Sequence, residues 1–318
     1  MYVVTGGAGF IGSNIVKLLN NEGIDNIIIV DDLKDGSKFE NIRTARFFDY
    51  MDKDEFIECI EKEKAGNQIK VIFHQGACTD TTEYNGKYML DNNYNYSKKL
   101  LNYAISRGID FIYASSAAVY GKNRDSRIDR VNEVPVNIYG FSKLLFDNYV
   151  RRIIKNVDIT LVGLRYFNVY GPGERHKGEM SSMVYQIYNQ LKGEGVVRLF
   201  EGSDGYDPGE QLRDFVYVED VAKVNLFFAI NSNKKYKGIF NVGTGIARSF
   251  NEVFNIWKNI LGKGEVEYVP FPPGLKEKYQ SFTKADLTNL REAGYQDKFT
   301  PLEQGIKKYY EWLQVNEN

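Results

Sequence analysis

The glycine-rich segment Thr5–Gly12 (TGGAGFIG) constrains the fold of this chain more than any other feature. It follows a short apolar run, Tyr2–Thr5, that predicts a strand, and it precedes a helix predicted over Ile11–Asn21. Glycines at such a strand-to-helix turn let a pyrophosphate approach the backbone N–H groups of the helix N-terminus. The segment therefore predicts a binding site for a dinucleotide.

The spacing of these glycines supports the same interpretation. Gly7, Gly9 and Gly12 fit the dinucleotide fingerprint, and Gly6 with Gly9 and Gly12 fits a variant with wider spacing. Asp31 follows nineteen residues after Gly12, at the end of the second predicted strand. A carboxylate at that point can bind the hydroxyls of an adenosine ribose. Spacing and acid together favour a dinucleotide site over a purely structural turn.

Strands and helices alternate through the first half of the chain. Predicted strands are Tyr2–Thr5, Asn26–Val30, Val71–His74, Asp110–Ser115 and Ile159–Tyr166. Predicted helices are Ile11–Asn21, Asp54–Lys64, Asn92–Ser106 and Tyr139–Ile154. This alternation predicts an α/β fold, a Rossmann-type doubly wound parallel sheet with helices on both faces. We assign residues 1–166 to an NAD(P)-binding domain of this kind.

The second half of the chain alternates less regularly. Predicted helices are Met180–Lys192, Glu219–Ile230, Asn251–Leu261, Lys284–Ala293 and Pro301–Gln314. Predicted strands are Val197–Leu199, Gly238–Asn241 and Val266–Phe271. We expect residues 167–318 to form mainly a smaller α/β substrate-binding lobe at the carboxyl edge of the sheet, with some segments returning to the first domain.

Composition argues against several other classes of protein. The formal net charge of −1 disfavours a nucleic-acid-binding protein and one held to a membrane surface by charge. No apolar run is long enough to span a bilayer. The first strand is predicted to begin at Tyr2, which leaves no room for a secretion signal. Two cysteines and two histidines offer neither a disulfide framework nor a metal cluster. We therefore expect a cytoplasmic protein without a metal.

Tyr139 and Lys143 lie four residues apart in a predicted helix, so they share one helix face. A tyrosine hydroxyl has a reference pKa of about 10 and is a poor base at neutral pH. A neighbouring ammonium group and an oxidised nicotinamide stabilise its phenolate, as proton removal from a sugar hydroxyl during hydride transfer requires. Ser115 and Ser116 end the preceding strand, where a hydroxyl can hydrogen-bond the reacting oxygen.

The choice of cofactor depends on a balance of charges. Asp31 by itself predicts NAD, because a carboxylate repels a 2′-phosphate. Lys38 and Lys53 follow closely in the sequence and can neutralise that phosphate. We expect NADP as the cofactor, with NAD as the alternative.

Three further blocks extend these motifs through the chain: Ser115–Gly121 (SSAAVYG), Arg165–Pro172 (RYFNVYGP) and Arg213–Val221 (RDFVYVEDV). With the glycine segment and the Tyr-Lys pair, they resemble the extended short-chain dehydrogenase/reductase family, in its nucleotide-sugar branch. Within that branch the chain is most similar to the ADP-L-glycero-D-manno-heptose 6-epimerases. The similarity to that group lies in His74–Glu83 (HQGACTDTTE), Asp91–Tyr94 (DNNY), His176–Gly178 (HKG), Phe200–Ser203 (FEGS) and Lys278–Gln280 (KYQ).

The resemblance implies an isomerase that epimerises ADP-D-glycero-D-manno-heptose at C6, using bound NADP, to make a precursor of the lipopolysaccharide inner core. It also implies a homo-oligomer, pentameric in the group it resembles. By the same resemblance the catalytic residues are Tyr139, Lys143, Ser116 and, as a second acid/base, Lys177. Its implied cofactor residues are Gly6, Gly9, Phe10, Ile11, Gly12, Asp31, Asp32, Lys38, Lys53, Gln75, Gly76, Ala77, Cys78, Thr79, Asn92, Lys143, Val169 and Lys177. Its implied substrate residues are Ser116, Asn168, Glu179, Gln186, Phe200, Glu201, Gly202, Ser203, Arg213 and Tyr279.

The sequence departs from the resembled group at a few of these positions. Asp32 stands where Asn is usual, and Glu179 and Gln186 stand where Ser and His are usual. These departures affect the cofactor phosphate and the sugar pocket.

Three other functions share parts of this pattern. A UDP-hexose 4-epimerase shares the glycines, the Tyr and the Lys, but that function does not explain the His-Lys-Gly segment. A nucleotide-sugar dehydratase usually has Asp-Glu after the strand-end serines, where this chain has Ala117 and Ala118. A non-catalytic regulator that senses NAD(P) typically lacks the Tyr-Lys pair, which this chain keeps.

Overall fold

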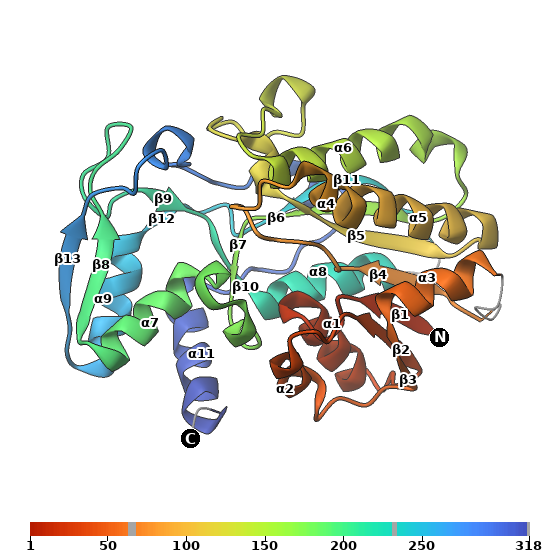
Figure 1. The fold of residues 1–318 in the computed structure, drawn as a ribbon, viewed down its shortest axis with the longest axis horizontal. Helices are drawn as coiled ribbons and strands as arrows, with labels where there is room; N and C mark the ends of the chain where they lie inside the picture. The colour runs from red at the N-terminus through yellow and green to blue at the C-terminus, as the bar shows by residue number, and fades with distance from the viewer. Residues whose placement is uncertain (63–67, 231–233, 317–318) are drawn as a thin grey trace.

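The computed structural model describes residues 1–62, 68–230 and 234–316. Seven strands form one sheet in the order β11-β6-β5-β4-β1-β2-β3, and all neighbours are parallel (Figure 1). These strands are β1 Tyr2–Thr5, β2 Ile27–Asp31, β3 Asp49–Asp52, β4 Val71–His74, β5 Asp110–Ser116, β6 Leu161–Tyr166 and β11 Lys237–Val242. The predicted α/β fold with a doubly wound parallel sheet is confirmed.

Helices cover both faces of this sheet because successive strand residues point to opposite sides. Val4 and Ile29 pack with α1 and α8 on one face, whereas Val3 and Val30 pack with α3, α5 and α6 on the other. The helices of the chain are α1 Phe10–Asn21, α2 Phe39–Ile42, α3 Lys53–Glu61, α4 Gly86–Leu90, α5 Tyr96–Arg107, α6 Ile138–Ile153, α7 Met183–Gly193, α8 Val218–Ile230, α9 Phe250–Leu261, α10 Thr288–Glu292 and α11 Leu302–Asn316.

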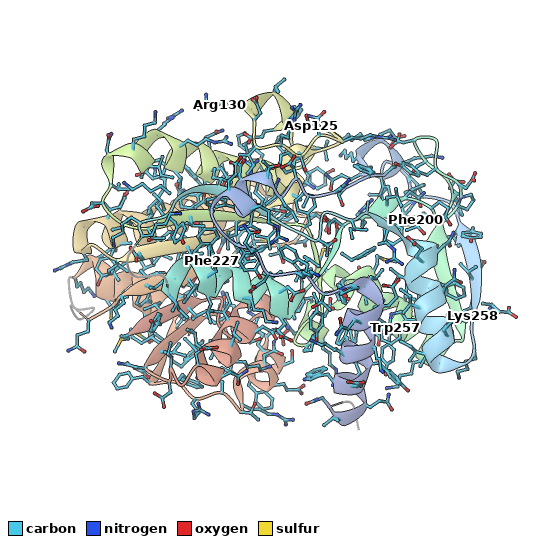
Figure 2. The ribbon with its side chains drawn as sticks, turned by 180° about the vertical axis from the view of Figure 1, so that it is seen from behind. Asp125, Arg130, Phe200, Phe227, Trp257 and Lys258 are labelled. Carbon is cyan, nitrogen blue, oxygen red and sulfur yellow. The ribbon has the colours of Figure 1, made fainter. Side chains whose placement is uncertain are left out.

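A second lobe lies beside the carboxyl ends of the strands, at the left of Figure 1. In it α7, α9 and α11 pack around a core that contains Trp257, whose indole N–H donates to the Val184 carbonyl at 2.8 Å. Figure 2 shows the neighbouring Lys258 pointing outward from α9. The remaining strands are β7 Asn168–Tyr170, β8 Val196–Phe200, β9 Leu212–Arg213, β10 Phe215–Tyr217, β12 Arg248–Ser249 and β13 Glu265–Val269.

The chain crosses between the two parts more than once. After β10, α8 packs against α1, and β11 pairs with β6 at the edge of the large sheet. Residues 167–318 therefore contribute both to the lobe and to the dinucleotide-binding part, and the division at residue 166 stays a proposal about function. None of the described helices is both long and apolar enough to cross a membrane.

Two differences from the predicted elements have local causes. The helix predicted over Lys284–Ala293 is helical only in α10, because side chains outside it take the preceding backbone groups. Asp214 accepts the N–H of Ala285 at 2.9 Å, and Ser126 accepts the N–H of Asp286 at 2.8 Å. The helix predicted over Asn92–Ser106 begins with a π-helical turn, residues 91–95, before α5. The end of the helix predicted over Asp54–Lys64 lies outside the described residues.

Candidate active site

The glycine segment forms a tight turn between β1 and α1. Gly6 has φ of +65°, and a Cβ there would lie 2.7 Å from the backbone nitrogen of Gly76. A Cβ on Gly12 would lie 2.1 Å from the Gly6 carbonyl oxygen, so neither position accepts a side chain. Gly9 precedes the helix, and no side chain caps the first turn of α1. The turn therefore fits a pyrophosphate, which such uncapped N–H groups bind.

A cavity of about 200 Å³ lies at the end of β2, where two carboxylates each face a lysine. The Lys38 ammonium is 3.1 Å from the Asp31 carboxylate, and that of Lys53 is 3.8 Å from Asp32. Asp31 also accepts the N–H of Ala8 at 2.8 Å, which joins it to the glycine turn. Nine residues expected at the cofactor line this cavity: Gly6, Asp31, Asp32, Lys38, Lys53, Gly76, Ala77, Cys78 and Asn92.

A larger cavity of about 400 Å³ brings together residues of the sheet edge and of the second lobe. Fourteen residues expected at the cofactor or substrate line it: Phe10, Ile11, Gln75, Ala77, Thr79, Ser116, Tyr139, Lys143, Asn168, Val169, Lys177, Phe200, Arg213 and Tyr279. Every residue expected to be catalytic is thus on the wall of one cavity.

Tyr139 and Lys143 occupy the first two turns of α6. Asn137 caps this helix by accepting the N–H of Gly140 at 2.8 Å. The Lys143 ammonium donates to the carbonyl of Ala114 in β5 at 2.9 Å, which holds the helix against the strand. The cap and this bond place both side chains at the carboxyl edge of the sheet.

Burial sets the ionisation of this pair. It lowers the pKa of Lys143 to about 8, although the nearby Asp147 carboxylate opposes the shift. It raises the pKa of Tyr139, and a hydrogen bond with Ser116 offsets part of that rise. A phenolate at Tyr139 therefore needs added positive charge nearby.

Lys177 lines the same cavity from a different segment of the chain. It lies in the loop between β7 and α7, with its ammonium 5.7 Å from the ring centre of Phe10, the first residue of α1. Lys177 and Tyr139 line the same cavity, Lys177 beside the start of α1 and Tyr139 from the start of α6. Burial lowers the pKa of Lys177, and the Glu174 carboxylate opposes that shift.

Arg213 places a buried cation in the part of the cavity formed by the second lobe. Its guanidinium lies over the rings of Tyr279 and Phe250, 4.9 and 5.3 Å from their centres. Within the described part of the chain, no carboxylate pairs with it. Burial lowers the pKa of Arg213, and the Tyr279 hydroxyl opposes that shift. The position suits a phosphate or diphosphate group.

Aromatic rings continue the wall beyond Arg213. Phe200, labelled in Figure 2, stacks on Phe271 with ring centres 4.5 Å apart, and Tyr279 packs edge-on against both. The sequence analysis singled out Phe200 and Tyr279, which line the cavity, but not Phe271, which follows β13 and packs against both without lining the cavity. Phe271 stands in a proline-rich stretch of the sequence, where no local pattern indicates that its ring would contact Phe200 and Tyr279.

Several residues expected at the site lie outside the walls of the two cavities. Gln186 donates to the carbonyls of Glu179 and Ser181, so it supports the loop before α7. Glu201 pairs with Lys276 at 2.7 Å. The residues that the cavities do not include are Gly9, Gly12, Glu179, Gln186, Glu201, Gly202 and Ser203.

Asn93 is a site residue that the sequence analysis did not single out. Its side-chain amide accepts the N–H of Cys78 at 2.8 Å and donates to the Cys78 carbonyl at 2.9 Å. It also donates to the Ser142 hydroxyl at 3.0 Å, next to Lys143. Asn93 thereby joins the wall of the cofactor cavity to α6. Its role depends on the π-helical turn, which often marks functional sites.

The fold and site define an NAD(P)-binding protein of the short-chain dehydrogenase/reductase type. The model of the NAD dependent epimerase/dehydratase family matches residues 2–243, well over half of the chain. The chain belongs to this family.

Solved structures are similar over nearly the whole length. The ADP-L-glycero-D-manno-heptose-6-epimerase of Helicobacter pylori is 34% identical, with a TM-score of 0.86, covering 99% of this chain and 96% of that one. The UDP-glucose 4-epimerase of Thermotoga maritima is 30% identical, with a TM-score of 0.83 and coverage of 100% and 99%. The UDP-N-acetylglucosamine 4-epimerase of Methanobrevibacter ruminantium is 26% identical, with a TM-score of 0.84 and coverage of 99% and 98%. The resemblance to sugar-nucleotide epimerases is confirmed.

Proposed function

We propose that this protein is an ADP-L-glycero-D-manno-heptose 6-epimerase that uses bound NADP. The observation that supports this most is that two acid/base groups from different segments, Tyr139 of α6 and Lys177 of the loop before α7, line one cavity. An epimerase that inverts a carbon must handle the substrate oxygen in two orientations. The similarity to the Helicobacter pylori enzyme agrees with this choice of substrate.

The chemistry explains why two such groups are needed. The carbon to be inverted bears a hydroxyl and has no carbonyl beside it, so no side chain can remove its hydrogen as a proton. A bound nicotinamide dinucleotide supplies a hydride acceptor and donor for that carbon. Tyr139 accepts the hydroxyl proton, Lys143 stabilises its phenolate, and Ser116 hydrogen-bonds the same oxygen. After the sugar end turns, its oxygen points away from Tyr139, and Lys177 donates the proton there.

The residues present fit this cofactor and a sugar nucleotide. The glycine turn would hold the pyrophosphate, and Lys38 and Lys53 would offset Asp31 and Asp32 around a 2′-phosphate. Arg213, buried without a carboxylate partner among the described residues, would bind the diphosphate of the substrate.

The direct test is turnover of ADP-D-glycero-D-manno-heptose by the purified protein, followed by NMR. In D₂O the product should contain no deuterium at the inverted carbon, because the hydride returns without solvent exchange. Deuterium at that carbon would overturn direct hydride return. Lys177→Met should keep its cofactor and epimerise very slowly, and normal turnover by this variant would remove Lys177 from the mechanism.

A UDP-hexose 4-epimerase is the second candidate, because the Thermotoga maritima enzyme is 30% identical. The same NMR assay with UDP-glucose distinguishes the two functions. Turnover of UDP-glucose but not of the ADP-heptose would replace our proposal. Absence of turnover with either, despite bound cofactor, would favour a non-catalytic regulator.

A further inference from the structure

One buried carboxylate ties together the two ends of the loop that contains Lys177. Glu174 is fully buried between β7 and α7. Its Oε1 accepts the N–H of Gly171 at 3.0 Å and the hydroxyl of Ser182 at 2.9 Å. Its Oε2 accepts the N–H of Ser182 at 2.5 Å. Because Ser182 caps α7, this single side chain fixes both the start of the loop and its entry into the helix.

The other side of the loop is held by amide side chains near the glycine turn. Asn41 donates to the carbonyls of Ala8 and Gly173, each at 3.0 Å, and Asn14 donates to the carbonyl of Pro172 at 2.8 Å. Asn41 also lies 3.3 Å from a ring nitrogen of His176, and Gln186 donates to the carbonyls of Glu179 and Ser181, so other side chains support the middle and the end of the loop. Glu174 differs from them because it bonds both Gly171, at the start of the loop, and Ser182, where the loop enters α7.

No neutral side chain of the same shape can make the same three bonds. Two backbone N–H groups point at two different oxygens, whereas an amide has one oxygen and one NH₂ group. In Glu174→Gln, one N–H of Gly171 or Ser182 would face another donor. The carboxylate also acts on Lys177 through its charge, since it opposes the lowering of that lysine's pKa by burial.

We propose that Glu174 is a positioning residue for Lys177, which it holds at the cavity wall by closing the loop onto α7. This inference rests on the proposed function, in which Lys177 is the second acid/base. Glu174 does not itself line the cavity, although it bonds Ser182, which does. We expect its effect on turnover to pass through Lys177.

A double-mutant cycle tests this dependence with ADP-D-glycero-D-manno-heptose as the substrate. Glu174→Gln should lower kcat between about 10- and 100-fold, the range expected when a reacting group is slightly misplaced. Its KM and bound cofactor should stay within about twofold of the wild type, because the cofactor cradle and Arg213 are untouched. The double variant Glu174→Gln/Lys177→Met should be no slower than Lys177→Met alone. Arg175→Gln, at an exposed position of the same loop, is the matched control and should behave as the wild type.

The possible results separate this inference from the proposed function. If the double variant is slower than Lys177→Met by the full factor seen for Glu174→Gln, Glu174 acts elsewhere and the inference is overturned. A kcat of Glu174→Gln equal to that of the wild type would also overturn the inference that Glu174 positions Lys177. If Lys177→Met itself turns over normally, it is the proposed role of Lys177 that fails. Should Glu174→Gln not fold, Glu174→Asp keeps the charge but is too short to reach both N–H groups, and the same cycle applies.

Discussion

Asp147 accepts two hydrogen bonds from the guanidinium of Arg165, at 2.9 and 2.8 Å, and both side chains are fully buried. Asp147 also accepts the hydroxyls of Tyr113 and Ser115 in β5, at 2.9 and 3.0 Å. It lies one turn after Lys143 on α6. This charged cluster therefore holds the helix of the Tyr-Lys pair against β5 and β6, beneath the cavity.

Removing one partner of this cluster should strongly destabilise the protein. Asp147→Asn would remove one carboxylate that pairs with the buried Arg165, which also pairs with Glu133 at 2.7 Å, and breaking a buried pair costs about 3–5 kcal/mol. We expect that loss in the free energy of unfolding, measured with urea. Glu58→Gln, which breaks the exposed pair with Lys62, should leave the unfolding midpoint nearly unchanged. An equal loss in the two variants would contradict this account.

Lys143 should reduce the stability of the cofactor-free protein at neutral pH. Its pKa is about 8 in the folded state against 10.5 as the reference, so the folded state binds the proton less tightly than the unfolded one. The destabilisation of the folded state by the charged Lys143 is fully present below pH 8 and disappears as the pH rises toward 10.5. The free energy of unfolding of Lys143→Met should therefore exceed that of the wild type by about 2–3 kcal/mol at pH 7, and this difference should shrink at pH 9–10. A gain that is constant with pH would show that packing, not charge, is responsible.

Tyr139→Phe should fold normally and lose at least about 100-fold in turnover, the lower range for general acid–base catalysis. The hydroxyl is the only group removed, and it lines the cavity where Ser116 hydrogen-bonds it. Turnover and cofactor content should be measured on the same preparation. A folded variant with bound cofactor and near-normal turnover would exclude Tyr139 as the base.

Lys53→Met should weaken binding of NADP more than binding of NAD. The ammonium of Lys53 lies 3.8 Å from Asp32 and donates to Asn92 at 3.1 Å, so its loss leaves Asp32 less neutralised at the end of β2. We expect about a tenfold weaker affinity for NADP, in the range of one charge-assisted hydrogen bond. Calorimetric titration of cofactor-stripped protein measures both affinities. An equal change for the two dinucleotides would place the 2′-phosphate elsewhere.

Local sequence patterns were sufficient to predict most strands of the large sheet. β1 and β4 match their predicted bounds, because buried parallel strands are continuous apolar runs bounded by glycine or polar residues. β3 (DYMD) was not predicted, since an edge strand with exposed positions lacks such a run. The strands of two or three residues in the second lobe were missed for a related reason: pairing with distant segments, not local preference, makes them extended.

The sequence alone determined the glycine turn, the Tyr-Lys pair and the acid at the end of β2, because each depends on spacing within one strand or helix. Only the tertiary structure decided which distant groups meet. It brought Lys177 and Arg213 to the cavity of Tyr139, and it buried Asp147 against Arg165, eighteen residues along the chain. Such contacts are set by how helices and loops pack on the sheet, and no local periodicity records them.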